Sequence, residues 1–178
     1  MTKKWTNASY LQWLAEATPT DWWHDSAAPA EISEALAYGA CGITTNPILV
    51  ARTIEQNRAH WQAALQNRLD GKTANEKAAI ITECVAGQAA ARVADRHTGA
   101  GNTGFVCAQV DPALAGYRDA MVEMARRFHA LAPNIAVKLP ATLAGLQALE
   151  ICASEGITTT ATVSFTVPQA LAIAEYFR

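Results

Sequence analysis

Residues 134–165 read NIAVKLPATLAGLQALEICASEGITTTATVSF and hold one strand–helix–strand unit. Asn134–Leu139 alternates as a strand does, and Thr142 follows as the cap of a helix whose leucines recur at helical spacing. The β-branched stretch Thr158–Phe165 predicts the next strand. A strand, a helix and a second strand in this order indicate neighbouring parallel strands with a helix packed against them.

The same alternation continues toward the N-terminus. Phe105–Val110 is a predicted strand, and shorter strands are expected at residues 21–26 and 41–44. Residues 113–131 predict a helix with one buried stripe, which comprises Leu114, Tyr117, Met121, Met124, Phe128 and Leu131. The other predicted helices span residues 8–17, 31–38, a stretch within 50–69, about 74–96 with a Thr73–Glu76 capping box, and a last one opened by Thr166.

About five strand–helix units fit two architectures. One is an open, doubly wound parallel sheet, and the other is a (β/α)8 TIM barrel, which typically needs about 250 residues. In the second case the chain holds only about the first five βα units, a truncated barrel. We expect an N-terminal helical segment at residues 1–20 and the partial barrel at residues 21–178.

Composition narrows the function classes. Of the 178 residues, 51% are hydrophobic and 17% charged, and the net charge is −2, so the chain is neither disordered nor suited to binding nucleic acid. No apolar run reaches the roughly 18 residues of a membrane helix, and polar Met1–Asn7 gives no secretory signal. The four cysteines are widely spaced. We therefore expect a cytoplasmic protein without a nucleic-acid or membrane partner.

Gly99–Gly104 matches the pattern G-x-G-x-x-G. In dinucleotide-binding proteins this pattern follows a strand and opens a helix, so that the helix N-terminus meets the pyrophosphate. Here the glycines follow a predicted helix and precede a predicted strand. We interpret them as a helix-to-strand connection. Nucleotide binding is then an alternative that only a doubly wound fold would support.

Polar residues stand near the C-terminal ends of the predicted strands. Alternation places Lys138, Gln109 and Thr162 on the faces opposite to those of their apolar neighbours. Asp25 and Asn46 stand at the ends of the two earlier strands. Barrel enzymes hold their active sites at this edge of the sheet. Each residue also has an ordinary interpretation: Asp25 as a helix cap, Asn46 as a turn residue, and Gln109 and Thr162 as polar strand residues.

Lys138 is the most unusual of these residues, because Val137, Leu139 and Pro140 surround it in the sequence. Burial favours the neutral amine over the ammonium ion, and a neutral amine attacks a carbonyl to form a Schiff base. The alternative is a lysine that extends to water or pairs with Asp25.

Four segments in order resemble the transaldolase family. They are Gly42-Ile-Thr-Thr-Asn-Pro47, Ala108-Gln-Val-Asp111, Val137-Lys-Leu-Pro-Ala-Thr142-x-x-Gly145 and Glu155-Gly-Ile157. The resemblance runs from about Asp21 to the end of the chain. It implies a (β/α)8 barrel and class I aldolase chemistry on sugar phosphates in the pentose phosphate pathway, with no metal and no organic cofactor.

The resemblance also implies roles for single residues. Lys138 resembles the Schiff-base lysine, and Asp25 the acid/base aspartate after the first strand. Asn46 is similar to the asparagine that binds substrate hydroxyls, and Thr162 to the threonine that helps hold the catalytic water. Gln109 departs from classical transaldolases, which carry a glutamate there, and matches the fructose-6-phosphate aldolase branch. A glutamine orients water but does not accept its proton as a carboxylate does.

A second departure concerns the later strands of the family, which supply a serine and an arginine for the substrate phosphate. The chain ends at Arg178, within the expected fifth helix. We therefore expect little activity from these 178 residues alone, and self-association that covers the open sheet edges. The alternative to an enzyme is a non-catalytic relative that binds sugar phosphates, or an inactive fragment.

Overall fold

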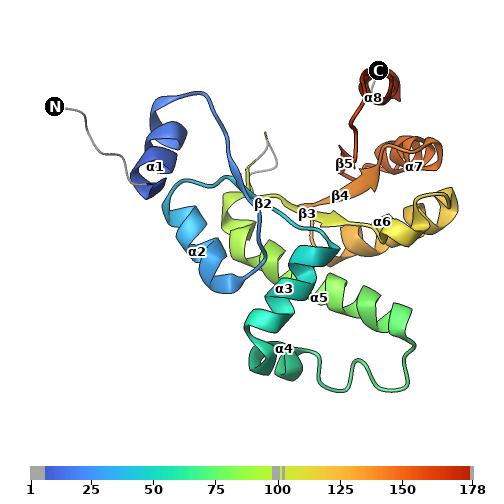
Figure 1. The fold of residues 1–178 in the computed structure, drawn as a ribbon, viewed down its shortest axis with the longest axis horizontal. Coiled ribbons are helices and arrows are strands. Elements are labelled where there is room, and N and C mark those ends of the chain that lie inside the picture. The colour runs from blue at the N-terminus through green and yellow to red at the C-terminus, as the bar shows by residue number, and fades with distance from the viewer. Residues whose placement is uncertain (1–6, 98–100, 102, 177–178) are drawn as a thin grey trace.

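A computed structural model describes residues 7–97, 101 and 103–176 of the chain. Helices and strands alternate along most of it (Figure 1). The strands are β1 (Trp23–His24), β2 (Gly42–Thr44), β3 (Val106–Gln109), β4 (Ile135–Pro140) and β5 (Thr159–Thr162). The helices are α1 (Asn7–Ala17), α2 (Pro29–Ala37), α3 (Pro47–Gln56), α4 (Arg58–Ala64), α5 (Ala74–Val93), α6 (Arg118–Leu131), α7 (Leu143–Ser154) and α8 (Val167–Tyr176), with short 3-10 helices η1 (Ala94–Arg96) and η2 (Pro112–Leu114).

The strands of the described chain form one parallel sheet in the order β1-β2-β3-β4-β5. A doubly wound sheet reverses its strand order at a switch point, whereas a barrel adds each strand beside the previous one. The sequential order therefore excludes the doubly wound alternative and identifies the first five βα units of a barrel. In Figure 1, α1 and α8 lie at opposite ends of this row of strands.

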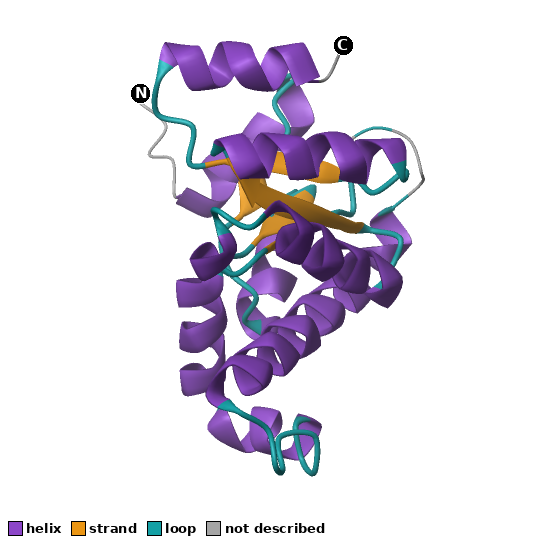
Figure 2. Ribbon diagram, turned by 90° about the vertical axis from the view of Figure 1, so that its right-hand side faces the viewer, coloured by secondary structure: helices purple, strands orange, loops and turns teal. Residues whose placement is uncertain are grey.

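One face of the sheet is buried under helices. Apolar side chains of the strands pack there against α5, α6 and α7 in a single core. The strand residues in this core are Ile43, Val106, Ala108, Ile135, Val137 and Leu139. Helices cover this outer face, and Figure 2 shows them around the strands. The predicted alternation of faces is thus confirmed for β3 and β4.

Two predicted helices are each divided. The helix expected within residues 50–69 is α3 followed by α4, because the backbone of Asn57 is not helical (φ −144°, ψ 65°) and its side chain accepts a hydrogen bond from His60 N. The helix expected at residues 113–131 is η2 followed by α6, with Tyr117 between them. The predicted stripe is wrong at Tyr117 and Leu131, which are exposed, whereas Leu114 is half-buried against the core. Its middle is confirmed, since Met121, Met124 and Phe128 are buried.

The last strand is shorter than predicted. β5 ends at Thr162, because Val163 turns into the left-handed region (φ 58°), and Phe165 is exposed. Thr166 opens α8 as expected, through hydrogen bonds with Gln169. The capping box of Thr73 and Glu76 at the start of α5 is confirmed.

The glycine-rich segment lies between η1 and β3, as a connection would. Gly99, Ala100 and Asn102 lie outside the described residues. Gly104 has φ +77°, and a Cβ there would come within 2.3 Å of the His97 backbone nitrogen. Close chain approach therefore explains this glycine. None of the helices in the described ranges is long and apolar enough to cross a membrane.

Candidate active site

A hollow of about 490 Å³ lies on the face of the sheet opposite to the helical core. All five strands or their flanking residues contribute to it. Trp23 and Phe105 line one end, toward the N-terminal ends of the strands, and Thr44, Lys138 and Thr162 lie toward the other. Lys138 and Thr162 of the predicted polar face therefore line this hollow, at its end nearer the C-terminal edge of the sheet.

Lys138 projects from β4 across the sheet to β2. Its Nζ donates hydrogen bonds to the Thr44 hydroxyl and to the Thr45 carbonyl oxygen, each at 3.3 Å. The side chain is half-buried. No ion pair of Lys138 or of Asp25 occurs among the described residues, so the structure does not pair this lysine with Asp25. The amine is held by neutral oxygen atoms at the rim of the hollow.

Thr45 and Asn46 fix the loop that receives the lysine. Thr45 is 1% exposed, and its hydroxyl donates to the Cys107 carbonyl oxygen at 2.7 Å. Asn46 is the N-cap of α3, where its Oδ1 accepts from Leu49 N at 2.9 Å. Pro47 occupies the first turn, where a missing N–H costs nothing. Lys138 thus contacts the peptide bond that joins Thr45 to Asn46.

Asp25 follows β1 and is exposed. The last paired residues of β1 and β2 are His24 and Ile43, and one residue further along come Asp25 and Thr44. Thr44 is the residue whose hydroxyl contacts Lys138. The structure therefore brings Asp25 to the same edge of the sheet as the amine, on the other side of Thr44.

Gln109 and Thr162 occupy different surroundings. Gln109 pairs in register with Lys138, but it lines a separate hollow of about 370 Å³ with Pro47, Asp111 and Met124. Thr162 lines the same hollow as Lys138 and ends β5. The structure thus gathers Lys138 and Thr162 in one hollow and leaves Gln109 at the border of the next.

Sequence reasoning missed two residues of the hollow beside Lys138, Thr160 and Cys107. Thr160 pairs in register with Lys138, and its hydroxyl lies 3.7 Å from Cys107 Sγ. Burial raises the pKa of the Cys107 thiol, while the Thr160 hydroxyl and the positive charge of Lys138 act in the opposite direction. The alternation of Thr158, Thr160 and Thr162 indicates that they share one face of the strand. It does not indicate that this face meets Cys107 of β3.

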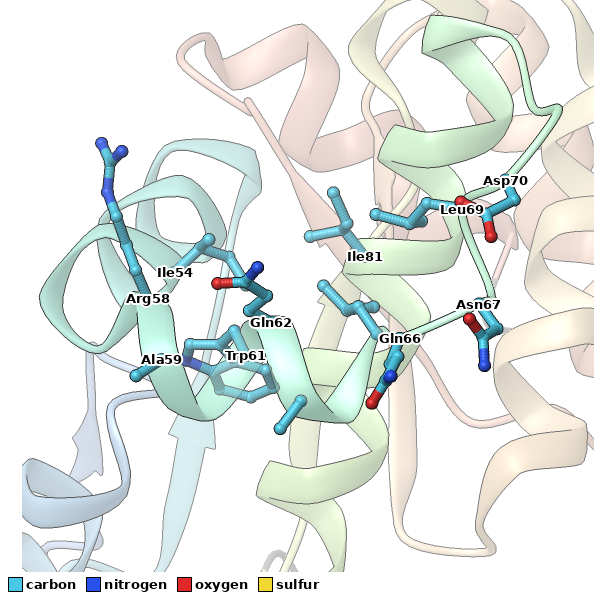
Figure 3. A pocket seen from close by; sticks show the side chains of 12 residues that line it. Ile54, Arg58, Ala59, Trp61, Gln62, Gln66, Asn67, Leu69, Asp70 and Ile81 are labelled. Carbon is cyan, nitrogen blue, oxygen red and sulfur yellow. The ribbon is translucent and has the colours of Figure 1, made fainter.

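A larger hollow lies elsewhere, between α4, the following loop and α5 (Figure 3). Its volume is about 750 Å³. Apolar side chains such as Ile54, Leu69 and Ile81 line it, while Arg58 extends away from them in Figure 3. It contains none of the sequence-predicted site residues, so size alone does not identify the candidate site.

Comparison with known proteins identifies the family of the chain. A sequence model of the family described as Transaldolase/Fructose-6-phosphate aldolase matches residues 22–176. The chain belongs to the transaldolase family. The transaldolase of Neisseria gonorrhoeae is 35% identical over 154 residues, which is 83% of this chain and 43% of that protein.

Other relatives give the same picture. The probable transaldolase of Pelotomaculum thermopropionicum is 33% identical over 148 residues, covering 83% of this chain and 52% of that protein. The probable transaldolase of Thermus thermophilus is 34% identical over 148 residues, covering 83% of this chain and 54% of its own. The chain therefore spans about half the length of the curated relatives it matches.

Proposed function

We propose that Lys138 forms a Schiff base with a ketose phosphate, and that the protein catalyses transaldolase-like transfer or aldol cleavage of that sugar. The single observation that carries the proposal is the position of the amine, which faces the hollow at the C-terminal edge of the sheet and contacts Thr44 and Thr45. Family membership supports the reaction class. The proposed chemistry is class I and needs no metal or organic cofactor.

The neutral Lys138 amine attacks the ketone carbon, and loss of water gives an iminium ion. With the iminium carbon as C2 of the ketose, removal of the proton from the C4 hydroxyl breaks the C3–C4 bond. This step releases an aldehyde and leaves an enamine on the lysine. In a transfer the enamine attacks an acceptor aldehyde, and in a simple cleavage it is protonated. Either step gives a new iminium ion, which water hydrolyses to release the product and free the amine.

The other site residues would serve these steps. In this proposal Asp25 shuttles the proton, because it stands across Thr44 from the amine. Asn46 binds substrate hydroxyls through its amide group, since only its Oδ1 is used in capping α3. Thr162 holds the water for imine hydrolysis together with Gln109, which requires the Gln109 side chain to reach over the border between the two hollows.

Reductive trapping tests the proposal. Dihydroxyacetone and borohydride should give a covalent adduct on Lys138, found by peptide mass spectrometry, and Lys138→Met should abolish it. Lys72→Met is the matched control, because Lys72 is an exposed residue that pairs with Glu76. Dihydroxyacetone carries no phosphate, so the amine is tested separately from phosphate binding. An adduct spread over all lysines, or none on Lys138, contradicts the mechanism.

A non-catalytic role is the second candidate, favoured by the separation of Gln109 from the Lys138 hollow. Calorimetry with fructose 6-phosphate separates the two candidates. Binding without any product or adduct supports the non-catalytic role. Product formation, or an adduct that requires Lys138, supports the enzyme.

We also propose that the 178-residue chain associates with copies of itself. The inner face of the sheet is an open hollow, β1 and β5 are edge strands, and Val163 and Phe165 are exposed beside it. Uncovered strand edges and apolar side chains favour association. Light scattering should therefore give a mass that is a multiple of the chain mass, and a uniform monomer contradicts this prediction.

A further inference from the structure

Gln169, in the first turn of α8, uses both ends of its amide group. Its Oε1 accepts hydrogen bonds from Phe165 N, Thr166 N and the Thr166 hydroxyl at 3.0–3.1 Å. Its Nε2 donates to the Ala141 carbonyl oxygen at 3.0 Å and to the Val163 carbonyl oxygen at 3.3 Å. The oxygen therefore caps the helix, and the nitrogen reaches back to the ends of two strands.

The two carbonyl groups lie where the β4–β5 ladder ends. The last backbone bond between the strands runs from Ala141 N to the Thr162 carbonyl oxygen at 2.8 Å. Beyond it, Val163 turns into the left-handed region, so the backbones offer each other no further donor in that direction. Gln169 Nε2 supplies the missing donor to both sides. The side chain thus adds one more rung to the ladder.

We propose that Gln169 is a positioning residue that holds the ends of β4 and β5 in register and thereby fixes Lys138 against Thr162. The inference rests on the proposed function only in that Lys138 is taken as the reacting amine. Lys138 lies three residues before Ala141, and Thr162 lies directly before Val163. Freeing the two carbonyls lets the strand ends separate at the rim of the hollow.

Two variants separate the role of Oε1, which caps α8, from the role of Nε2, which bridges the ends of β4 and β5. In Gln169→Glu a carboxylate still accepts the three bonds of the helix cap, and its charge is favourable at a helix N-terminus, but it has no N–H for Ala141 and Val163. In Thr166→Ala the reciprocal cap is lost, while the Gln169 bridge remains. A merely structural role predicts that both variants respond alike.

The first measurement is hydrogen exchange of the Ala141 amide, which needs no substrate. We expect exchange to be about fivefold faster in Gln169→Glu and unchanged in Thr166→Ala, because one hydrogen bond is worth about 1 kcal/mol. The second is the saturating rate of dihydroxyacetone trapping on Lys138. It should fall about tenfold in Gln169→Glu alone, with the half-saturating concentration unchanged.

Each outcome decides one point. Unchanged Ala141 exchange in Gln169→Glu overturns the bridge, and faster exchange with an unchanged trapping rate overturns the positioning role. If the parent chain gives no dihydroxyacetone adduct, the proposed function fails by itself. Reductive methylation of Lys138 by formaldehyde then replaces the trapping assay, because it requires only a reachable neutral amine. A rate on Lys138 that is equal in Gln169→Glu and the parent chain overturns the inference.

Discussion

Gly145 explains part of the Pro140-to-Gly145 motif without any role in chemistry. The first turn of α7 passes so close to β4 that a Cβ at Gly145 would lie 1.8 Å from the Pro140 carbonyl oxygen. Thr142 caps the same turn by accepting from Gly145 N at 3.0 Å, and its hydroxyl donates to the Ala115 carbonyl oxygen. These residues seat α7 directly behind Lys138. A family motif can thus mark the support of a site as well as its reacting groups.

Gly145→Ala should therefore lower the free energy of unfolding by about 3 kcal/mol, since backbone atoms must shift to admit the methyl group. Gly87→Ala is the matched control, because it lies in α5 with nothing within 4 Å of the added Cβ. The control should gain about 0.5–1 kcal/mol from helix propensity. Urea unfolding measures both. Equal effects at the two positions would show that the close approach at Gly145 is absent.

At the scale of elements, strands were more predictable than helix boundaries. The strands Phe105–Val110 and Asn134–Leu139 follow from alternation, because one face is wholly apolar and the other carries the half-buried Gln109 and Lys138. The division at Asn57 was not predictable, since the apolar spacing of Ile54 and Trp61 continues across it. In the site, a resemblance predicted Lys138, but only the fold brings Thr44 to it across β3.

The start of α5 is an element boundary that the sequence does specify. The Thr73 hydroxyl accepts from Glu76 N, and the Glu76 carboxylate accepts from Thr73 N. Thr73→Ala should lower the free energy of unfolding by about 1 kcal/mol, whereas Thr73→Ser keeps the cap and should be nearly neutral. Thermal and urea unfolding measure the difference. If serine and alanine are equally destabilising, the hydroxyl does not cap the helix and the threonine methyl group is what matters.

For the whole molecule, buried thiols make the stability of the fold depend on pH. Cys41, Cys107 and Cys152 are buried and free. Burial raises the pKa of all three thiols, and for Cys152, with Glu155 adding to the effect, the pKa rises to about 11. The folded chain therefore keeps protons that the unfolded chain has already released.

This difference fixes the sign of the pH dependence. A raised pKa gives a stability contribution that is complete below the ordinary thiol value of 9.0 and is lost as pH rises through the folded value. The free energy of unfolding should therefore fall between pH 9 and about 11, by up to about 1.4 kcal/mol per pH unit for each thiol. Cys152→Ala removes one titrating thiol and should reduce that slope by up to about 1.4 kcal/mol per pH unit. The lost sulfur also lowers the free energy of unfolding at every pH. Ala148→Gly is the control, because it weakens the same buried face of α7 without removing a titrating group. Urea unfolding across the alkaline range measures the slopes, and identical slopes for the parent chain and Cys152→Ala would mean that this thiol ionises as easily in the folded chain as in the unfolded one.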